Sequence, residues 1–187
     1  MGRWQPDAQG RLAEAAMQLF EERGFEATTV ADIAARAGLT KRTFFRYFAD
    51  KREVLFSGSQ GLQAAFVEAI AAAPADAAPL DAIARGLDAM ADLFEAIGDR
   101  PRKRQAIIAA NADLQERELI KMVGFAAAGA GALRSRGVAD PAATLAAEAG
   151  IAVLRVAFER WAGGPAGQDL HRLLAEGMSE LKSVAAA

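Results

Sequence analysis

Alanine fills 47 of the 187 positions of this chain, and that excess limits the fold more than any other feature of the sequence. Alanine has the highest intrinsic helix propensity of the common residues, whereas its methyl group buries little apolar area. It accounts for about half of the 52% of residues that are hydrophobic, while the chain holds one Tyr and few β-branched residues. The composition therefore predicts an all-α protein.

The composition also excludes several kinds of site. The chain has no cysteine, so it forms neither disulfides nor thiolate-ligated zinc sites. Its single histidine, His171, rules out any site that needs two imidazoles. The phosphate-binding pattern G-x-x-x-x-G-K-[ST], the zinc-protease pattern H-E-x-x-H and the nucleophile pattern G-x-S-x-G are all absent from the sequence. We therefore expect no enzyme, no metal and no cofactor.

Three helices are predicted near the N-terminus. Apolar residues recur every three or four positions over about residues 7–23, and a glycine ends that amphipathic helix. A short second helix follows Thr29, which begins a capping-box pattern, and it ends before Gly38. Thr40 is a good N-cap for a third helix that ends near position 48. Two short helices joined by a turn that contains glycine form a helix-turn-helix.

The rest of the chain predicts six further helices, about nine in all. We therefore divide the chain into a helix-turn-helix domain, residues 1–52, and a helical domain, residues 53–187. The sequence has no run of about 18 apolar residues and no signal-peptide pattern at its start, so we expect a soluble cytoplasmic protein without membrane contact. The six helices are predicted over about residues 51–73 after a cap at Asp50, 80–97, 101–110, 111 or 113 to 136, 140–162 and 168–184.

Positive charge is concentrated on the helix-turn-helix, although the whole chain has a formal net charge of -2. Residues 36–52 contain six basic side chains and one acidic side chain, a net charge of +5. Such a cluster on one element is the electrostatic footprint of phosphate binding. The alternative is a solvated basic face without a partner, but both helix caps, the turn glycine and the apolar positions Phe44 and Phe48 coincide with the cluster. We therefore expect this segment to bind double-stranded DNA.

Individual DNA contacts follow from the geometry of the motif. In a helix-turn-helix the second helix enters the major groove with its N-terminal residues at the base edges. Arg42 is then placed to bind a guanine edge with two hydrogen bonds, a contact worth about 1–3 kcal/mol of discrimination. Thr29 and Lys51 are each predicted at a helix N-terminus, where backbone N–H groups attract phosphate. The predicted DNA-binding residues are Thr29, Thr40, Lys41, Arg42, Thr43, Phe45, Tyr47 and Lys51.

The N-terminal segment resembles the DNA-binding domain of the TetR family of transcriptional regulators over roughly residues 10–56. The resemblance rests on matches at fixed spacing in residues 28–34, 37–41, 43–48 and 51–53. It implies an all-helical homodimer whose divergent C-terminal domain binds a small-molecule effector and forms the dimer. The family usually has tyrosine at the position of Phe45, and its hydroxyl donates to a phosphate. Phenylalanine cannot make that contact, so we expect Tyr47 to provide more of the phosphate binding.

Apolar stripes on the last two predicted helices are candidates for the dimer interface. Small residues in the first stripe permit close helix approach, and four helices packed about a two-fold axis would bury both stripes. The alternative is that one or both stripes face the core of their own subunit. The predicted interface residues are Leu145, Ala149, Ala152, Val153, Val156, Leu170, Leu173, Leu174, Met178 and Leu181.

Large apolar residues stand out from the alanine background of the C-terminal domain. Ligand pockets are mostly apolar with a few polar groups, although core packing explains the same residues equally well. The predicted ligand-binding residues are Met90, Phe94, Ile107, Asn111, Met122, Phe125, Phe158 and Trp161.

Together, these features and the resemblance predict a regulator, most often a repressor in this family. It would bind a palindromic operator as a homodimer and be released by a small, largely apolar ligand. Two recognition helices about 34–36 Å apart would read the two half-sites. The alternative is a helical small-molecule-binding or interaction protein without effective DNA binding, and Phe45 is the one residue that favours it.

Overall fold

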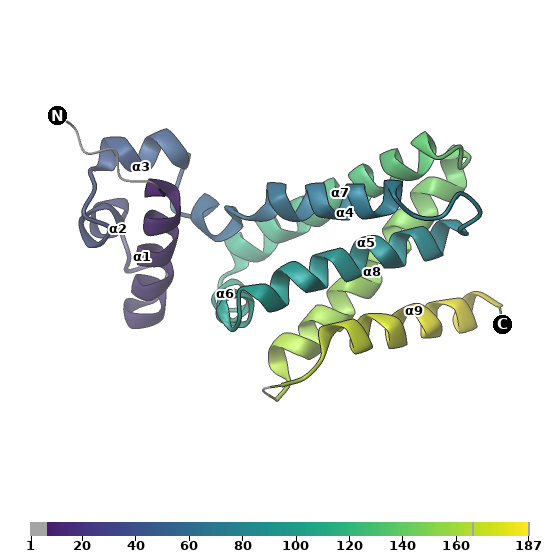
Figure 1. Ribbon diagram of the computed structural model, residues 1–187. Coiled ribbons are helices and arrows are strands. Elements are labelled where there is room, and N and C mark those ends of the chain that lie inside the picture. Colours follow the sequence, from purple (N-terminus) through teal and green to yellow (C-terminus); the bar gives the residue numbers. More distant parts are fainter. Residues whose placement is uncertain (1–6, 166, 187) are drawn as a thin grey trace. The chain divides into compact units, whose positions relative to one another are not determined.

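The computed structural model describes residues 7–165 and 167–186, and in these residues the chain forms nine α-helices, one 3-10 helix and no β-strand (Figure 1). The all-α prediction is therefore confirmed. The observed helices begin and end within about two residues of the predicted ones, except over residues 51–73. The elements are α1 (Ala8–Arg23), α2 (Val30–Arg36), α3 (Lys41–Tyr47), the 3-10 helix η1 (Glu53–Phe56), α4 (Ser59–Ala71), α5 (Pro79–Ala96), α6 (Arg100–Ala109), α7 (Ala112–Ser135), α8 (Asp140–Gly163) and α9 (Leu170–Ala186).

The single helix predicted over residues 51–73 is wrong, because the chain there forms η1 and then α4. Asp50 caps η1, since its Oδ1 atom accepts the backbone N–H groups of Arg52 at 2.8 Å and Glu53 at 3.1 Å. Ser57 and Gly58 separate η1 from α4, and both are weak helix formers. A continuous helix was therefore not favoured locally.

The chain folds into two compact units. The first contains the described residues up to Gly58 together with Lys103–Gln115, and the second contains Ser59–Arg102 together with the chain from Glu116 onward. This division differs from the predicted boundary between residues 52 and 53. Helices α6 and α7 each supply residues to both units, which no pattern in the sequence indicated.

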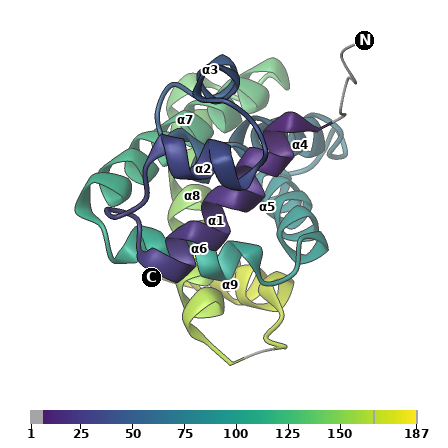
Figure 2. The same cartoon turned by 90° about the vertical axis from the view of Figure 1, so that its left-hand side faces the viewer.

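The first unit is built on α1, α2 and α3, and Figure 2 shows α2 lying across α1. Phe20, Ile33 and Phe44 meet in its core, where each is at most 3% exposed. Ile108 and Leu114, from the end of α6 and the start of α7, are fully buried in the same core. The later segment is therefore part of the domain that carries the helix-turn-helix.

The second unit is a helical bundle in which α4 packs along α5, and α5, α8 and α9 contact one another (Figure 1). Glycines let these helices approach closely. A Cβ atom on Gly86 of α5 would lie 2.5 Å from the Phe66 ring of α4, and one on Gly129 of α7 would lie 2.8 Å from the same ring. Small residues therefore shape this alanine-rich core around a few large side chains.

Helix α8 is the most apolar long helix of the second unit. Of the helices in the described residues, it alone is long and apolar enough, by length and composition only, to cross a membrane, with a mean hydropathy of 1.4 over its most apolar window. Half of that window is buried inside the protein. Ile151, Leu154 and Phe158 lie in the core of the unit, so packing against α5 and α9 accounts for the buried half of this window.

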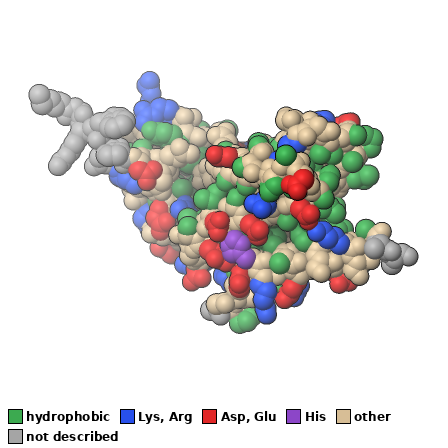
Figure 3. Space-filling model, turned by 45° about the vertical axis from the view of Figure 1, so that its right-hand side comes forward, with side chains coloured by type: hydrophobic (Ala, Val, Ile, Leu, Met, Phe, Trp, Pro, Cys, Tyr) green, Lys and Arg blue, Asp and Glu red, His purple; other side chains and the backbone are tan. Residues whose placement is uncertain are grey.

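His171 connects the first turn of α9 to α5. Its Nδ1 atom lies 3.4 Å from the Asp88 carboxylate and its Nε2 atom lies 3.1 Å from that of Asp92. Figure 3 shows the purple histidine bordered by red carboxylates on the surface. Partial burial lowers the pKa of His171, but the Asp88 hydrogen bond and the charges of Glu95, Asp88 and Asp92 outweigh burial and raise it above its ordinary value. In the part of the chain that the structure describes, no group of three or more His, Cys, Asp or Glu is arranged to hold a metal ion.

This raised pKa predicts a pH-dependent stability. Protonated His171 contributes fully below its unfolded pKa of about 6.5, and the contribution is lost as pH rises through the folded value. The urea midpoint of unfolding should therefore be higher at about pH 6 than at about pH 9, and the difference should shrink in His171→Gln. Circular dichroism at both pH values measures this. An undiminished pH dependence in His171→Gln would contradict the assignment.

Candidate nucleic-acid interface

Side-chain caps fix the start of both helices of the helix-turn-helix. Thr29 and Asp32 form a reciprocal capping box at α2, in which Thr29 Oγ1 accepts the Asp32 N–H at 3.2 Å and the Asp32 carboxylate accepts the Thr29 N–H at 3.0 Å. The hydrogen bonds from the Thr29 hydroxyl and backbone lower the pKa of Asp32. Asp32 therefore already places a negative charge at the N-terminus of α2, and the predicted phosphate contact of Thr29 stays a prediction.

A tight turn joins α2 to α3. Gly38 adopts a φ of 65°, and the next N–H, of Leu39, donates to the carbonyl of Ala34 at 2.8 Å. Thr40 then caps α3 by accepting the N–H of Thr43 at 3.2 Å, and the two threonine hydroxyls lie 3.1 Å apart. Thr40 is exposed and Thr43 is half-buried. Both predicted contact residues thus lie where α3 begins, and their hydroxyls hydrogen-bond to each other.

The two faces of α3 differ in chemistry. Phe44 and Phe48 are buried in the core, with ring centroids 5.4 Å apart, as the sequence predicts. Lys41, Arg42 and Phe45 are exposed on the surface of α3. The helix therefore presents two cations and an aromatic ring to solvent from a rigid base.

Three of the six cations in residues 36–52 form ion pairs with carboxylates, and the longest of these pairs joins the Lys51 ammonium to the Glu26 carboxylate at 3.9 Å. Arg36 donates two hydrogen bonds to Glu22 of α1, at 2.8 and 2.7 Å. The bond to Arg36 lowers the pKa of Glu22 and raises the pKa of Arg36. Arg52 lies 3.1 Å from the Asp50 carboxylate. The sequence charge of +5 therefore overstates the charge that this surface offers to a ligand.

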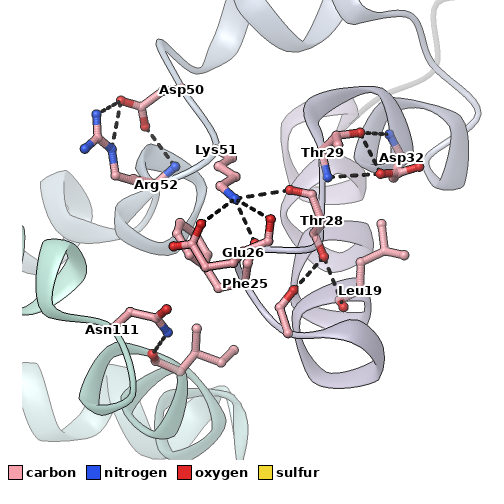
Figure 4. A network of polar contacts seen from close by, with 12 residues as sticks. Leu19, Phe25, Glu26, Thr28, Thr29, Asp32, Asp50, Lys51, Arg52 and Asn111 are labelled. Carbon is pink, nitrogen blue, oxygen red and sulfur yellow. Dashed lines mark hydrogen bonds and ion pairs between the residues drawn. The ribbon is translucent and has the colours of Figure 1, made fainter.

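Lys51 is a structural contact of the first unit, and it is not at the N-terminus of an α-helix as predicted (Figure 4). Its ammonium donates to the carbonyls of Phe25 at 2.8 Å, Glu26 at 3.3 Å and Thr28 at 3.3 Å, and it lies 4.2 Å from the centroid of the Phe25 ring. Those three carbonyls match the three N–H donors of a lysine. Lys51 thus holds the loop between α1 and α2, and its contact with phosphate remains untested.

Lys41 and Arg42 differ from the other cations of this segment in having no polar partner among the described residues. Neither makes a hydrogen bond or ion pair with any residue that the structure describes, and both are exposed. Arg46, which the predicted contact set omits, donates to the Tyr47 hydroxyl at 3.0 Å and lies over its ring. The sequence could have indicated Arg46 as a DNA contact, because it is one of the six basic residues of the cluster in residues 36–52. The arrangement suits a polyanion that meets α3 at Lys41 and Arg42.

The second basic run, residues 100–104, is engaged within the fold. In the second unit, the Arg102 guanidinium lies 4.2 Å from the Trp161 ring centroid and donates to the Gly164 carbonyl at 3.1 Å. In the first unit, Arg104 donates to the Leu55 carbonyl at 2.7 Å and lies over the Phe56 ring. These contacts within each unit account for the cations at the start of α6.

The structure does not bring the eight predicted ligand-binding residues together. Met90, Phe125, Phe158 and Trp161 are buried in the core of the second unit, and Phe94 and Met122 pack against that core. Ile107 and Asn111 belong instead to the first unit, where the Asn111 amide donates to the Ile107 carbonyl at 2.7 Å. The helical periodicity of the sequence identified Ile107 as apolar and Asn111 as a polar neighbour. It did not indicate that both residues belong to the first unit.

The predicted dimer residues fall into three groups by their exposure. Five of them are buried in the core of their own subunit and cannot form an interface, namely Val153, Leu170, Leu173, Leu174 and Met178. Ala149 and Leu181 are half-buried. Leu145, Ala152 and Val156 are exposed on the outer face of α8, where Leu145 is 71% exposed. The α9 stripe is therefore core, and the outer face of α8 is the candidate interface.

Comparison with known proteins gives a consistent result for the N-terminal segment. Residues 12–57 match the profile of bacterial regulatory proteins of the tetR family. Over 73 residues, or 39% of this chain, the sequence is 40% identical to the HTH-type transcriptional regulator TcmR of Streptomyces glaucescens. The match spans 32% of the length of that regulator. The similarity in sequence is thus concentrated in the part that carries the helix-turn-helix.

Solved structures extend the similarity to the whole fold. The Thermus thermophilus FadR repressor, a TetR-family protein solved in complex with lauroyl-CoA, superposes with a TM-score of 0.59 at 24% identity and 93% coverage of both chains. The fatty acid degradation regulator FadR of Bacillus halodurans gives a TM-score of 0.62 at 20% identity and 96% coverage of both chains. At these identities the likeness concerns the fold alone.

Proposed function

We propose that this chain, whose residues 12–57 match the tetR family of bacterial regulatory proteins, is a transcriptional regulator of that family that binds a palindromic DNA operator as a homodimer. The family is one of regulators and not of enzymes. The observation that carries the proposal is the pair of uncommitted cations, Lys41 and Arg42, on the exposed face of α3. Regulators of this family are cytoplasmic, and we propose the same location for this chain.

The contacts of α3 support DNA as the partner. The second helix of a helix-turn-helix lies in the major groove, and side chains from its N-terminal end reach the base edges. Arg42 has five N–H donors in a planar fork, which suits the O6 and N7 atoms of guanine, while Lys41 is suited to a phosphate. Phe44 and Phe48 fix the orientation of α3 from the buried side. The reading surface is thus held rigidly by the core.

The outer face of α8 supports a homodimer as the binding form. Leu145, Ala149, Ala152 and Val156 follow one another at helical spacing on a side of α8 that the subunit leaves largely uncovered. Leu145 and Ala149 also line an open groove of about 450 Å³, with Leu181 and Ala185 of α9 on its other side. A two-fold interface uses the same surface patch on both subunits, which the apolar face of α8 can supply, and two recognition helices are needed to read a palindrome.

The core of the second unit supports a small, largely apolar effector that releases the protein from DNA. Phe94, Phe158 and Trp161 form a cluster in which successive ring centroids lie 4.9 and 5.4 Å apart. The Thermus FadR structure, similar in fold, contains lauroyl-CoA. An effector acts only if it prefers one arrangement of the protein over the other, so it must bind the DNA-free form more tightly.

A salt titration of DNA binding tests the proposal. The homodimer and a duplex from its own upstream region should show a linear fall of log affinity with log salt, by about 1,000-fold from about 50 to 200 mM if six phosphates are neutralised. Fluorescence anisotropy of a labelled duplex measures the affinity. A salt-independent response, or no binding to any duplex, would leave only an effector-binding or interaction protein.

A further inference from the structure

Phe45 is a large apolar side chain of α3 that lies mostly in solvent. Phe45 is 57% exposed, and its ring makes an edge-on contact with Phe44, with centroids 5.5 Å apart and planes at 85°. This contact orients the ring but leaves more than half of the residue in solvent. An aromatic side chain held on a rigid helix and left uncovered is suited to a partner.

The neighbours of Phe45 define that partner. Phe45 follows Lys41 by four residues and Arg42 by three, so all three lie on the same side of α3. Both cations are exposed and make no hydrogen bond or ion pair within the described residues. A polyanion that binds both Lys41 and Arg42 therefore also lies against Phe45. This step rests on the proposed function, because it takes the polyanion to be duplex DNA.

The major groove of duplex DNA displays one apolar group, the C5 methyl of thymine. We propose that Phe45 reads a thymine in each half-site by packing its ring against that methyl group. Phenylalanine has no hydroxyl, so it cannot instead donate a hydrogen bond to a phosphate. Three residues advance a helix by about 4.5 Å and one base pair spans about 3.4 Å. The thymine therefore lies within about two base pairs of the base that Arg42 contacts.

Replacement of thymine by deoxyuridine tests this contact, because it removes the methyl group and keeps every hydrogen-bonding atom. The operator is first selected from random duplexes with the full-length homodimer, and each thymine within two base pairs of the Arg42 position is then replaced in both half-sites. The wild-type protein should lose about fourfold in affinity for each methyl removed at the contacted position. Phe45→Ala should bind the thymine and deoxyuridine duplexes equally.

Leu119→Ala is the matched control, because Leu119 is an equally exposed apolar residue on α7. This variant should keep the full difference between the two duplexes. The proposal is overturned if the wild-type protein binds both duplexes alike at every tested thymine, or if Phe45→Ala retains the full difference. If the wild-type protein binds no duplex in a salt-dependent manner, the proposed function itself fails and the reading of thymine falls with it.

Discussion

Replacing Arg42 with alanine is expected to lower the affinity for the operator by about 30-fold or more. A bidentate contact between arginine and guanine is worth about 1–3 kcal/mol, and a homodimer loses it in both half-sites, so the loss is at least about 2 kcal/mol. The guanidinium makes no hydrogen bond or ion pair with the described residues, so its removal leaves no buried group unpaired. The effect should therefore appear in binding and not in stability.

The expected loss for Arg42→Ala is specific to sequence. Fluorescence anisotropy at fixed salt should show a much smaller loss for an unrelated duplex than for the operator, because base contacts specify and phosphate contacts position. Lys41→Ala should lower the affinity for both duplexes by a similar factor. Arg85→Ala, which removes the same charge from an exposed position on α5, is the control and should leave both affinities unchanged. An equal loss on both duplexes for Arg42→Ala would reassign Arg42 to a phosphate.

Leu145→Glu is expected to convert the homodimer into monomers at micromolar concentration. Burial of a leucine side chain is worth about 1.5–3 kcal/mol, and each dimer contains two copies. Loss of both raises the dissociation constant by at least about 150-fold, and two carboxylates placed in an apolar contact raise it further. Because Leu145 is largely exposed within its own subunit, the variant should keep its helical content. Sedimentation velocity and circular dichroism measure the two properties.

A second variant tests whether the dimer interface lies on the outer face of α8 or on another exposed apolar patch. Leu119, Ile120 and Val123 of α7 are each more than half exposed, so Leu119→Glu places the same charge on a comparable surface. It should leave the dimer intact. If Leu119→Glu were monomeric and Leu145→Glu dimeric, the interface would lie on α7. Since one recognition helix makes few contacts, a monomeric Leu145→Glu should also bind the operator weakly.

Local signals in the sequence were sufficient to predict where most helices begin and end. Thr29 and Thr40 cap α2 and α3 as predicted, and Gly38 makes the turn between them with a positive φ. Caps and turn glycines act through hydrogen bonds and dihedral angles within a few residues, so the chain near them determines the outcome. The helix predicted over residues 51–73 failed because η1 is drawn into the core of one unit while α4 belongs to the other.

Charge counting failed where partners are distant in sequence. Arg36 pairs with Glu22, 14 residues away, and Lys51 binds the carbonyl of Phe25, 26 residues away. Counting charges within residues 36–52 treated both cations as available. Lys41, Arg42 and Arg46 are the cations of this segment without a carboxylate partner among the described residues, and Arg46 donates a hydrogen bond to Tyr47. This result narrows the candidate DNA-binding site from the eight predicted residues to the exposed face of α3.

The sequence by itself determined the all-α class, the helix-turn-helix and the basic character of its second helix, because helix propensity, capping and local charge act over short stretches of chain. Only the tertiary structure decided which apolar stripe is core, which cations stay available and which unit α6 and α7 join. Periodicity marks an apolar face, but it does not say what covers that face. The covering surfaces come from segments far apart in sequence, as when Ile108 joins the core of α1–α3.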